Sequence, residues 1–247
     1  RDDYRIFINS PQIGELIVKL ITETTTGLGL KLSSTKTKTS NDVVRASIKS
    51  DKLAWMARKQ SGKGLQKHLL IIHDHATNFP NSGSLVIALN DYHKRVSRIT
   101  SLSESPQPLI AIVVDIAYRN PRTYAICAAI LSKLLSFAES NDERLAIAKR
   151  IRKKFSQIPN TGHMQIWLQR VTFPLDRRID YDEAVCKLVA ARADRLWNND
   201  WILSQDLKVA VDATKIVAAT IRDEIAPVIP LKEVELFLSK AGEGYYG

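Results

Sequence analysis

The chain has 247 residues, of which 45% are hydrophobic and 25% are charged, and this composition favours a folded protein over a disordered one. No apolar run approaches the ~20 residues that a membrane-spanning helix needs, so such a helix is excluded. The net charge is +10, and residues 31–100 carry 13 basic and only 4 acidic side chains. A basic segment of this kind favours binding to a polyanion, although a solvated surface remains an alternative.

The first forty residues combine strand-like and helix-like patterns. Apolar residues at every second position predict short strands over 4–9 and 28–32. Between them, apolar residues at a spacing of about 3.6 predict a helix over 13–26. This order of elements predicts a short α/β unit over residues 1–40.

From residue 41 onward the patterns predict only helices joined by short loops. The helices are expected over 43–56, either continuous or broken near Ser50, and over 65–77, 85–99, 109–118, 121–138, 142–157, 162–172, 181–197, 205–224 and 231–240. The segment 101–108 is rich in Ser and Pro and is the predicted linker. The chain is therefore predicted to be mostly α, ending in a bundle or an irregular helical-repeat-like array.

Two adjacent carboxylates, Asp2 and Asp3, stand where a turn enters the first predicted strand. Carboxylate oxygens are ligands that Mg²⁺ prefers, and two metal ions held in this way can catalyse nucleotidyl transfer. A pair of Asp residues alone is more often a solvated turn. Here, however, a helix and the segment 29–37, which contains Lys36, follow the pair.

These segments together resemble the end of a reverse-transcriptase palm. The similar stretches are Arg1-Asp2-Asp3-Tyr4-Arg5-Ile6-Phe7, the helix after them, and Gly29-Leu30-Lys31-Leu32-Ser33-Ser34-Thr35-Lys36-Thr37. The helical region is similar to that of bacterial defence-associated reverse transcriptases of the unknown-group, abortive-infection and retron-like kinds. The stretches that carry this second similarity are 50–53, 81–85, 120–124, 159–162, 166–170 and 197–201.

The resemblance implies an RNA-directed DNA polymerase that acts in bacterial anti-phage defence. It implies Mg²⁺ as the cofactor, dNTPs as substrates, a non-coding RNA as the template, a DNA product and possible homo-oligomers. It assigns metal binding and catalysis to Asp2 and Asp3, and a catalytic position near the triphosphate to Lys36. The chain departs from better-known relatives in the cation at Arg1 and in a polar segment, 37–44, where a primer-grip motif is expected.

The same resemblance divides the chain into a palm end over 1–40, a basic helical thumb over 41–100 and a C-terminal helical domain over 106–247. The third catalytic carboxylate and the fingers would precede Arg1. Because the first residue is Arg and not Met, we expect a longer gene product, and we expect this chain alone to be inactive.

Several basic residues of the predicted thumb recur at helix-compatible spacings and are expected to contact nucleic acid. They are Arg45, Lys49, Lys52, Arg58, Lys59, Lys63 and Lys67. Gln169 and Arg170, beside Trp167, are predicted RNA contacts, whereas Trp167, Trp197 and Trp201 are expected to fill the core. The basic run 149–154 is either a capped helix end or a second phosphate-binding patch.

Other chemistries find less support in the sequence. His68, His73 and His75 lack a second group of ligands, so we favour imidazoles that face a groove over a zinc site. The two cysteines, Cys127 and Cys186, stand in apolar helical patterns, which favours reduced thiols and a cytoplasmic location. The alternative to a polymerase is a non-catalytic helical-repeat RNA-binding protein.

Overall fold

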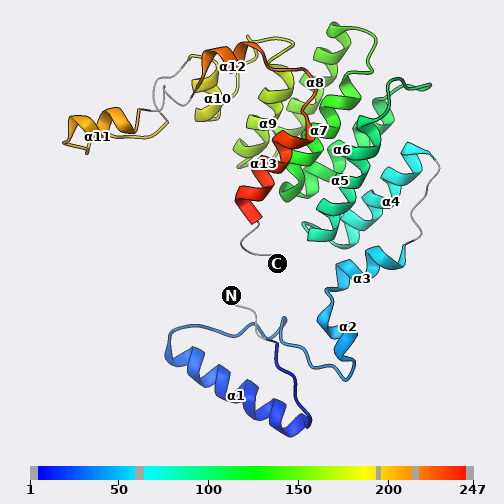
Figure 1. Cartoon of the computed structure of the whole chain (residues 1–247), viewed down its shortest axis with the longest axis vertical. Coiled ribbons are helices and arrows are strands. Elements are labelled where there is room, and N and C mark those ends of the chain that lie inside the picture. The colour runs from blue at the N-terminus through cyan, green and yellow to red at the C-terminus, as the bar shows by residue number, and fades with distance from the viewer. Residues whose placement is uncertain (1–4, 59–63, 193–195, 213–216, 243–247) are drawn as a thin grey trace. The chain divides into compact units, whose positions relative to one another are not determined.

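The computed structural model describes residues 5–58, 64–192, 196–212 and 217–242. In these residues the regular structure is helical and contains no strand, so the prediction of a mostly α protein is confirmed. The chain divides into two compact units, Arg1–Ala54 and Trp55–Gly247, and their helices are labelled in Figure 1. None of the described helices is both long and apolar enough to cross a membrane.

The first unit contains α1 (Pro11–Gly27), α2 (Val43–Ser47) and the beginning of α3 (Ser50–Ala57). Pro11 lies in the first turn of α1, where its missing N–H costs no hydrogen bond. The Asp42 carboxylate caps α2 by accepting a hydrogen bond from the Arg45 N–H at 2.9 Å. None of the described residues of this unit is fully buried, so it encloses no hydrophobic core of its own.

Large apolar side chains of the first unit stay exposed instead. The exposed set comprises Ile6, Phe7, Ile8, Ile13, Leu16, Val18, Leu20, Leu28, Leu30, Val43 and Val44. The exposed fraction of Phe7 is as high as 72%. Burying one large apolar side chain is worth about 1.5–3 kcal/mol, so a covering partner would stabilise this unit.

The two predicted strands are wrong for the residues that the structure describes. Residues 5–8 and 28–32 form no strand, because a strand needs a neighbour for its backbone groups. The chain leaves α1 by a local turn, in which Gly29 has a φ of 73° and the Leu30 N–H donates to the Thr25 carbonyl at 2.8 Å. This left-handed helix ending suits glycine and uses the backbone groups locally.

The second unit is an array of helices that begins within α3. Its helices are α4 (Leu65–Asn78), α5 (Gly83–Ser97), α6 (Gln107–Arg119), the 3₁₀ turn η1 (Pro121–Thr123), α7 (Tyr124–Leu135), α8 (Asn141–Phe155), α9 (Gly162–Thr172), α10 (Ala184–Val189), α11 (Gln205–Ala210), α12 (Ala219–Asp223) and α13 (Leu231–Gly242). The helix α4 packs against α5 and α6, and α5 packs against α7.

The helix α7 is the centre of the core. It contacts α5, α6, α9 and α13, and all its residues except Lys133 are buried. The Ser132 hydroxyl accepts a hydrogen bond from the Ile229 N–H at 2.9 Å, which ties the segment before α13 to this helix. A helix that is apolar around its whole circumference is typical of a core position.

Two asparagines connect the loop before α5 with the loop before α7. Asn120 is fully buried, and its Oδ1 accepts a hydrogen bond from the Asn81 N–H at 2.7 Å. In return, the Asn81 Oδ1 accepts a hydrogen bond from the Arg122 N–H at 3.2 Å. Asn81 has a φ of 54°, a conformation that asparagine tolerates better than most residues. The two helix pairs are thus locked together at one end.

The structure differs from the predicted boundaries at two places. The predicted linker 101–108 lies within the second unit, where residues 101–106 form a loop and 107–108 begin α6, and α4 and α5 share one core with α6 and α7. The helices predicted over 181–197 and 205–224 are shorter, since α10 ends at Val189 and two short helices, α11 and α12, replace the other. Neither α11 nor α12 has a buried residue, and helices gain most of their stability from packing.

Candidate nucleic-acid interface

The predicted catalytic residues lie in the first unit. Asp2 and Asp3 lie outside the described residues, as do Lys59 and Lys63 of the predicted thumb. Lys36 is exposed on a turn in which its N–H donates to the Ser33 carbonyl at 3.1 Å. The helix α1 occupies the predicted position between the Asp pair and this turn.

The basic residues of the predicted thumb are divided between the two units. Arg45, Lys49 and Lys52 lie in the first unit, whereas Arg58 and Lys67 lie in the second. All except Arg58 are exposed.

Arg58 has a structural contact that the sequence did not reveal. Its Nη1 lies 2.6 Å from the Asp74 Oδ2 on α4 and donates to the Ile71 carbonyl at 3.4 Å. The ion pair spans sixteen positions of sequence, too far for a helix-spacing argument to detect. Arg58 therefore neutralises an acidic side chain of its own chain.

The predicted RNA contacts on α9 are likewise engaged within the chain. Gln169 is 5% exposed, and its Nε2 donates to the Cys186 carbonyl at 2.8 Å. Arg170 forms a two-pronged ion pair with Glu233 on α13, with distances of 2.7 and 2.9 Å, and its Nη1 donates to the Ala226 carbonyl. Both side chains join α9 to later segments, and their contact with RNA stays a prediction.

The tryptophans divide between core and surface. Trp167 is buried, as expected, and its indole N–H points to the His163 Nε2 at 3.0 Å. Trp197 and Trp201 are 47% and 74% exposed, so the core expectation is wrong for both. They lie in a segment without helix, where the Trp201 indole N–H donates to the Asn198 carbonyl. The three polar residues between these tryptophans break the apolar periodicity that a core helix needs.

The histidines on α4 make separate contacts. His73 lies 2.7 Å from Asp115 on α6, and the His75 Nε2 lies 2.8 Å from the Ser84 hydroxyl. Burial, and secondarily the nearby Arg95, lowers the pKa of His68. In the described part of the chain, no group of three or more His, Cys, Asp or Glu side chains is arranged to hold a metal ion.

Both cysteines are buried free thiols. Burial raises the pKa of Cys127 to about 12, an effect that a hydrogen bond to Thr123 partly offsets. Burial also raises the pKa of Cys186 to about 12, and the charge of Glu183 adds to this shift. At neutral pH both groups are therefore protonated and chemically unreactive.

The basic run 149–154 lies in the second half of α8. Lys149, Arg150, Lys153 and Lys154 are all exposed on this helix. No described residue forms an ion pair with any of them within 4.0 Å. Unlike Arg58 and Arg170, these side chains present net positive charge to solvent.

The thumb assignment predicts a measurable salt effect. Changing Lys59, Lys63 and Lys67 together to Gln should weaken binding of a template–primer duplex, because each phosphate contact contributes to counterion release. The slope of log affinity against log salt should flatten by about two units if most of the three touch phosphate. Fluorescence anisotropy over a salt series measures both quantities.

The matched control changes Lys187, Lys208 and Lys232 to Gln, three cations on separate helices of the second unit. This variant loses the same charge and should change the slope far less. Equal slopes for the two variants would mean that the basic segment is only a solvated surface.

Comparison with known proteins does not identify a family. No family model matches the chain, and no curated protein matches it. The functional assignment therefore depends on the residue pattern and on the placement of the described residues.

Proposed function

We propose that the chain is the C-terminal part of an RNA-directed DNA polymerase that acts in bacterial anti-phage defence. One observation carries this proposal, namely the order of an Asp pair, an amphipathic helix and a lysine-bearing turn. The described residues support it in one respect, since α1 and the turn at Lys36 follow one another as the pattern predicts.

The exposed apolar surface of the first unit supports the proposal independently of the motif. In a palm, a sheet would cover α1. Such a sheet would bury Ile13, Leu16 and Leu20, which are exposed along α1. We therefore propose that a sheet outside the described residues covers this surface and carries the third catalytic carboxylate.

The chemistry of the donor set suits Mg²⁺, because Asp2 and Asp3 offer only oxygen ligands. We assign the firmer metal contact to Asp2 and a weaker or structural one to Asp3. When bound, the metal ions supply activation of the primer hydroxyl and neutralise the leaving pyrophosphate. The Lys36 ammonium would add positive charge beside the triphosphate and assist departure of the pyrophosphate.

We propose further that the second unit is a short helical-repeat array that binds the RNA or DNA strand. Three helix pairs support this assignment, α4–α5, α6–α7 and α8–α9. Asn81, Asn120 and Asn160 stand at the turns between the paired helices, at intervals of 39 and 40 residues. Asn81 and Asn160 both have a positive φ, and each belongs to a Pro-Asn-Ser/Thr-Gly turn. A period near forty residues is typical of paired-helix repeats.

The second candidate is a non-catalytic helical-repeat RNA-binding protein. The observation that favours it is the exposed basic face of α8, which lies in a unit with its own core. In that case the Asp pair has no catalytic role, and affinity for RNA comes mainly from the second unit.

One experiment separates the two candidates. The 247-residue chain and the complete gene product are each incubated with Mg²⁺, an RNA template, a DNA primer and dNTPs. We expect synthesis by the complete product and none by the chain alone, because the third carboxylate and the template channel are missing from the latter. Synthesis by the isolated chain would overturn its assignment as a partial palm. RNA binding without synthesis by either protein would favour the non-catalytic candidate.

A further inference from the structure

The outer face of α8 carries four cations within six residues. Lys149, Arg150, Lys153 and Lys154 are exposed, whereas Ile147, Ala148, Ile151 and Phe155 fill the buried face. At about 100° per residue, the four cations fall within one arc of ~140° on the side away from the core. With a rise of ~1.5 Å per residue, they span only about 8 Å along the helix axis.

The spacing of these cations opposes helix stability. Lys149 and Lys153, and likewise Arg150 and Lys154, are four positions apart, where like charges repel. No acidic residue stands three or four positions from any of the four, although a Glu–Lys alternation is usual on a solvated helix face. The helix dipole offsets part of this repulsion. A partner with negative charge would remove the rest.

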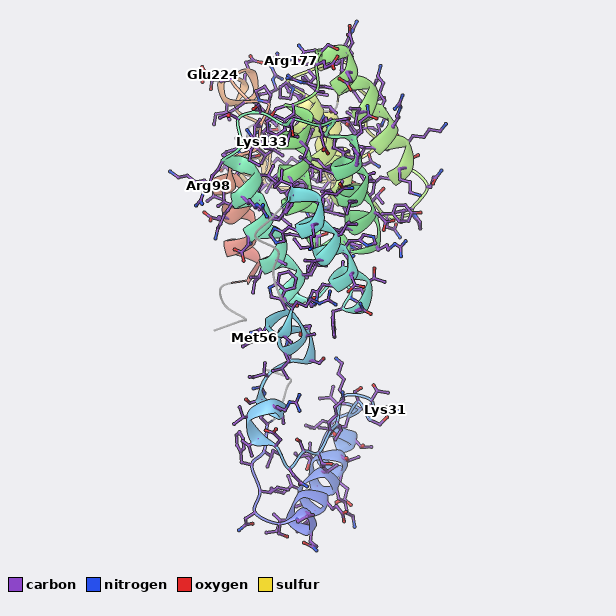
Figure 2. All side chains as sticks on the ribbon, turned by 90° about the vertical axis from the view of Figure 1, so that its right-hand side faces the viewer. Lys31, Met56, Arg98, Lys133, Arg177 and Glu224 are labelled. Atoms are coloured by element: carbon purple, nitrogen blue, oxygen red, sulfur yellow. The ribbon has the colours of Figure 1, made fainter. Side chains whose placement is uncertain are left out.

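Side chains of neighbouring segments approach two of these cations. The Lys154 Nζ lies 4.5 Å from the centre of the Tyr118 ring at the end of α6. On another side, the charge of Lys149 is among the causes that lower the pKa of Asp176, after the hydrogen bonds from Arg178. Arg178 pairs with this Asp176 at 3.1 Å, and Arg177 pairs with Asp223 at 2.8 Å. Figure 2 labels Arg177 at one end of the second unit.

The residue types on this face of α8 favour a nucleic acid over a membrane or a protein as the partner. Helices that lie on membranes insert large apolar residues, but none of the exposed large hydrophobic side chains belongs to α8. Protein interfaces have an apolar or aromatic centre and are depleted in Lys, whereas three of these four cations are Lys. A phosphodiester backbone needs only closely spaced cations without an apolar centre.

We propose that the outer face of α8, formed by Lys149, Arg150, Lys153 and Lys154, binds the phosphate backbone of a nucleic-acid strand without reading its bases. This site lies in the second unit and is separate from the predicted thumb residues. The inference does not rest on the polymerase proposal, because a non-catalytic protein could use the same surface.

The test uses the full chain with Lys149, Lys153 and Lys154 changed to Gln, and a fluorescent polyuridine RNA as the probe. Binding is measured by anisotropy in EDTA and without dNTPs, so that failure of catalysis cannot affect the result. Each lost contact removes about 0.7 from the salt slope of a single strand. Three lost contacts therefore weaken binding by up to about 100-fold at ~0.1 M salt.

The matched control changes Lys187, Lys208 and Lys232 to Gln and should retain the wild-type affinity within a few-fold. The α8 variant should unfold at no lower denaturant concentration than the wild type, because the change relieves repulsion between like charges. The proposal is supported if the α8 variant loses RNA affinity while its stability is intact, and if the wild-type chain binds polydeoxythymidine about as well as polyuridine. Equal affinities of the two variants would overturn it. Loss of binding to phosphatidylserine vesicles, with RNA binding unchanged, would identify a membrane as the partner and would also overturn it.

Discussion

Changing Asp2 and Asp3 together to Asn should abolish DNA synthesis by the gene product that contains this chain. Neutral amides cannot hold two Mg²⁺ ions against the negative charge that develops on the triphosphate. The loss should appear in the rate of incorporation of a labelled dNTP on a primed RNA template. The thermal unfolding midpoint should stay unchanged, which separates a chemical defect from a folding defect.

The matched control for the Asp pair changes Glu15 and Glu23 to Gln. Both lie exposed on α1 in the same unit, and Glu23 has only a weak ion pair with Lys19 at 3.9 Å. This variant loses the same negative charge and should incorporate dNTPs at the wild-type rate. Synthesis at the wild-type rate by the Asp variant would end the polymerase proposal.

Replacing Arg170 by Ala should lower the free energy of unfolding by about 1.5–3 kcal/mol. The side chain of Arg170 is 15% exposed, and its three hydrogen bonds to Glu233 and Ala226 join α9 to the C-terminal segment. Hydrogen bonds to charged groups contribute about this much when they are largely shielded from water. Urea denaturation followed by circular dichroism measures the loss.

The matched control is Arg177→Ala, which removes an ion pair with Asp223 in which both side chains are about half exposed. Exposed pairs contribute about 0–1 kcal/mol, so this variant should be nearly as stable as the wild type. RNA affinity of the folded Arg170 variant should also stay unchanged. If that affinity falls while stability does not, Arg170 is the RNA contact that the sequence predicted.

Helices of the second unit could be predicted because their evidence is local. Apolar residues three or four positions apart mark the buried faces of α4 and α5, and the structure buries Leu69, Ile72, Leu85 and Leu89 on them. The strand predictions over 4–9 and 28–32 failed for the described residues because alternation specifies a strand only when a neighbour pairs with it. The pairing strand can lie far away in the sequence, so a short segment does not reveal whether it is present.

The basic character of residues 31–100 could also be predicted, but its use could not. Folding brings distant segments together, so that Arg58 forms an ion pair with Asp74 and Arg170 forms one with Glu233. The charges of both arginines are therefore neutralised within the chain. Among the described residues, the four exposed cations of α8 have no ion-pair partner, and a signal was available in the sequence. Like charges four positions apart, without an acidic residue at helix spacing, destabilise the helix. Such a pattern therefore indicates a surface that binds a negatively charged partner.

The proposed polymerase would copy RNA into DNA. The most direct measurement is to sequence the DNA made by the complete product on an RNA of known sequence, with Mg²⁺ and all four dNTPs. We expect a Mg²⁺-dependent DNA strand complementary to that RNA. DNA unrelated to the template, or binding of the RNA with no DNA made, would contradict it.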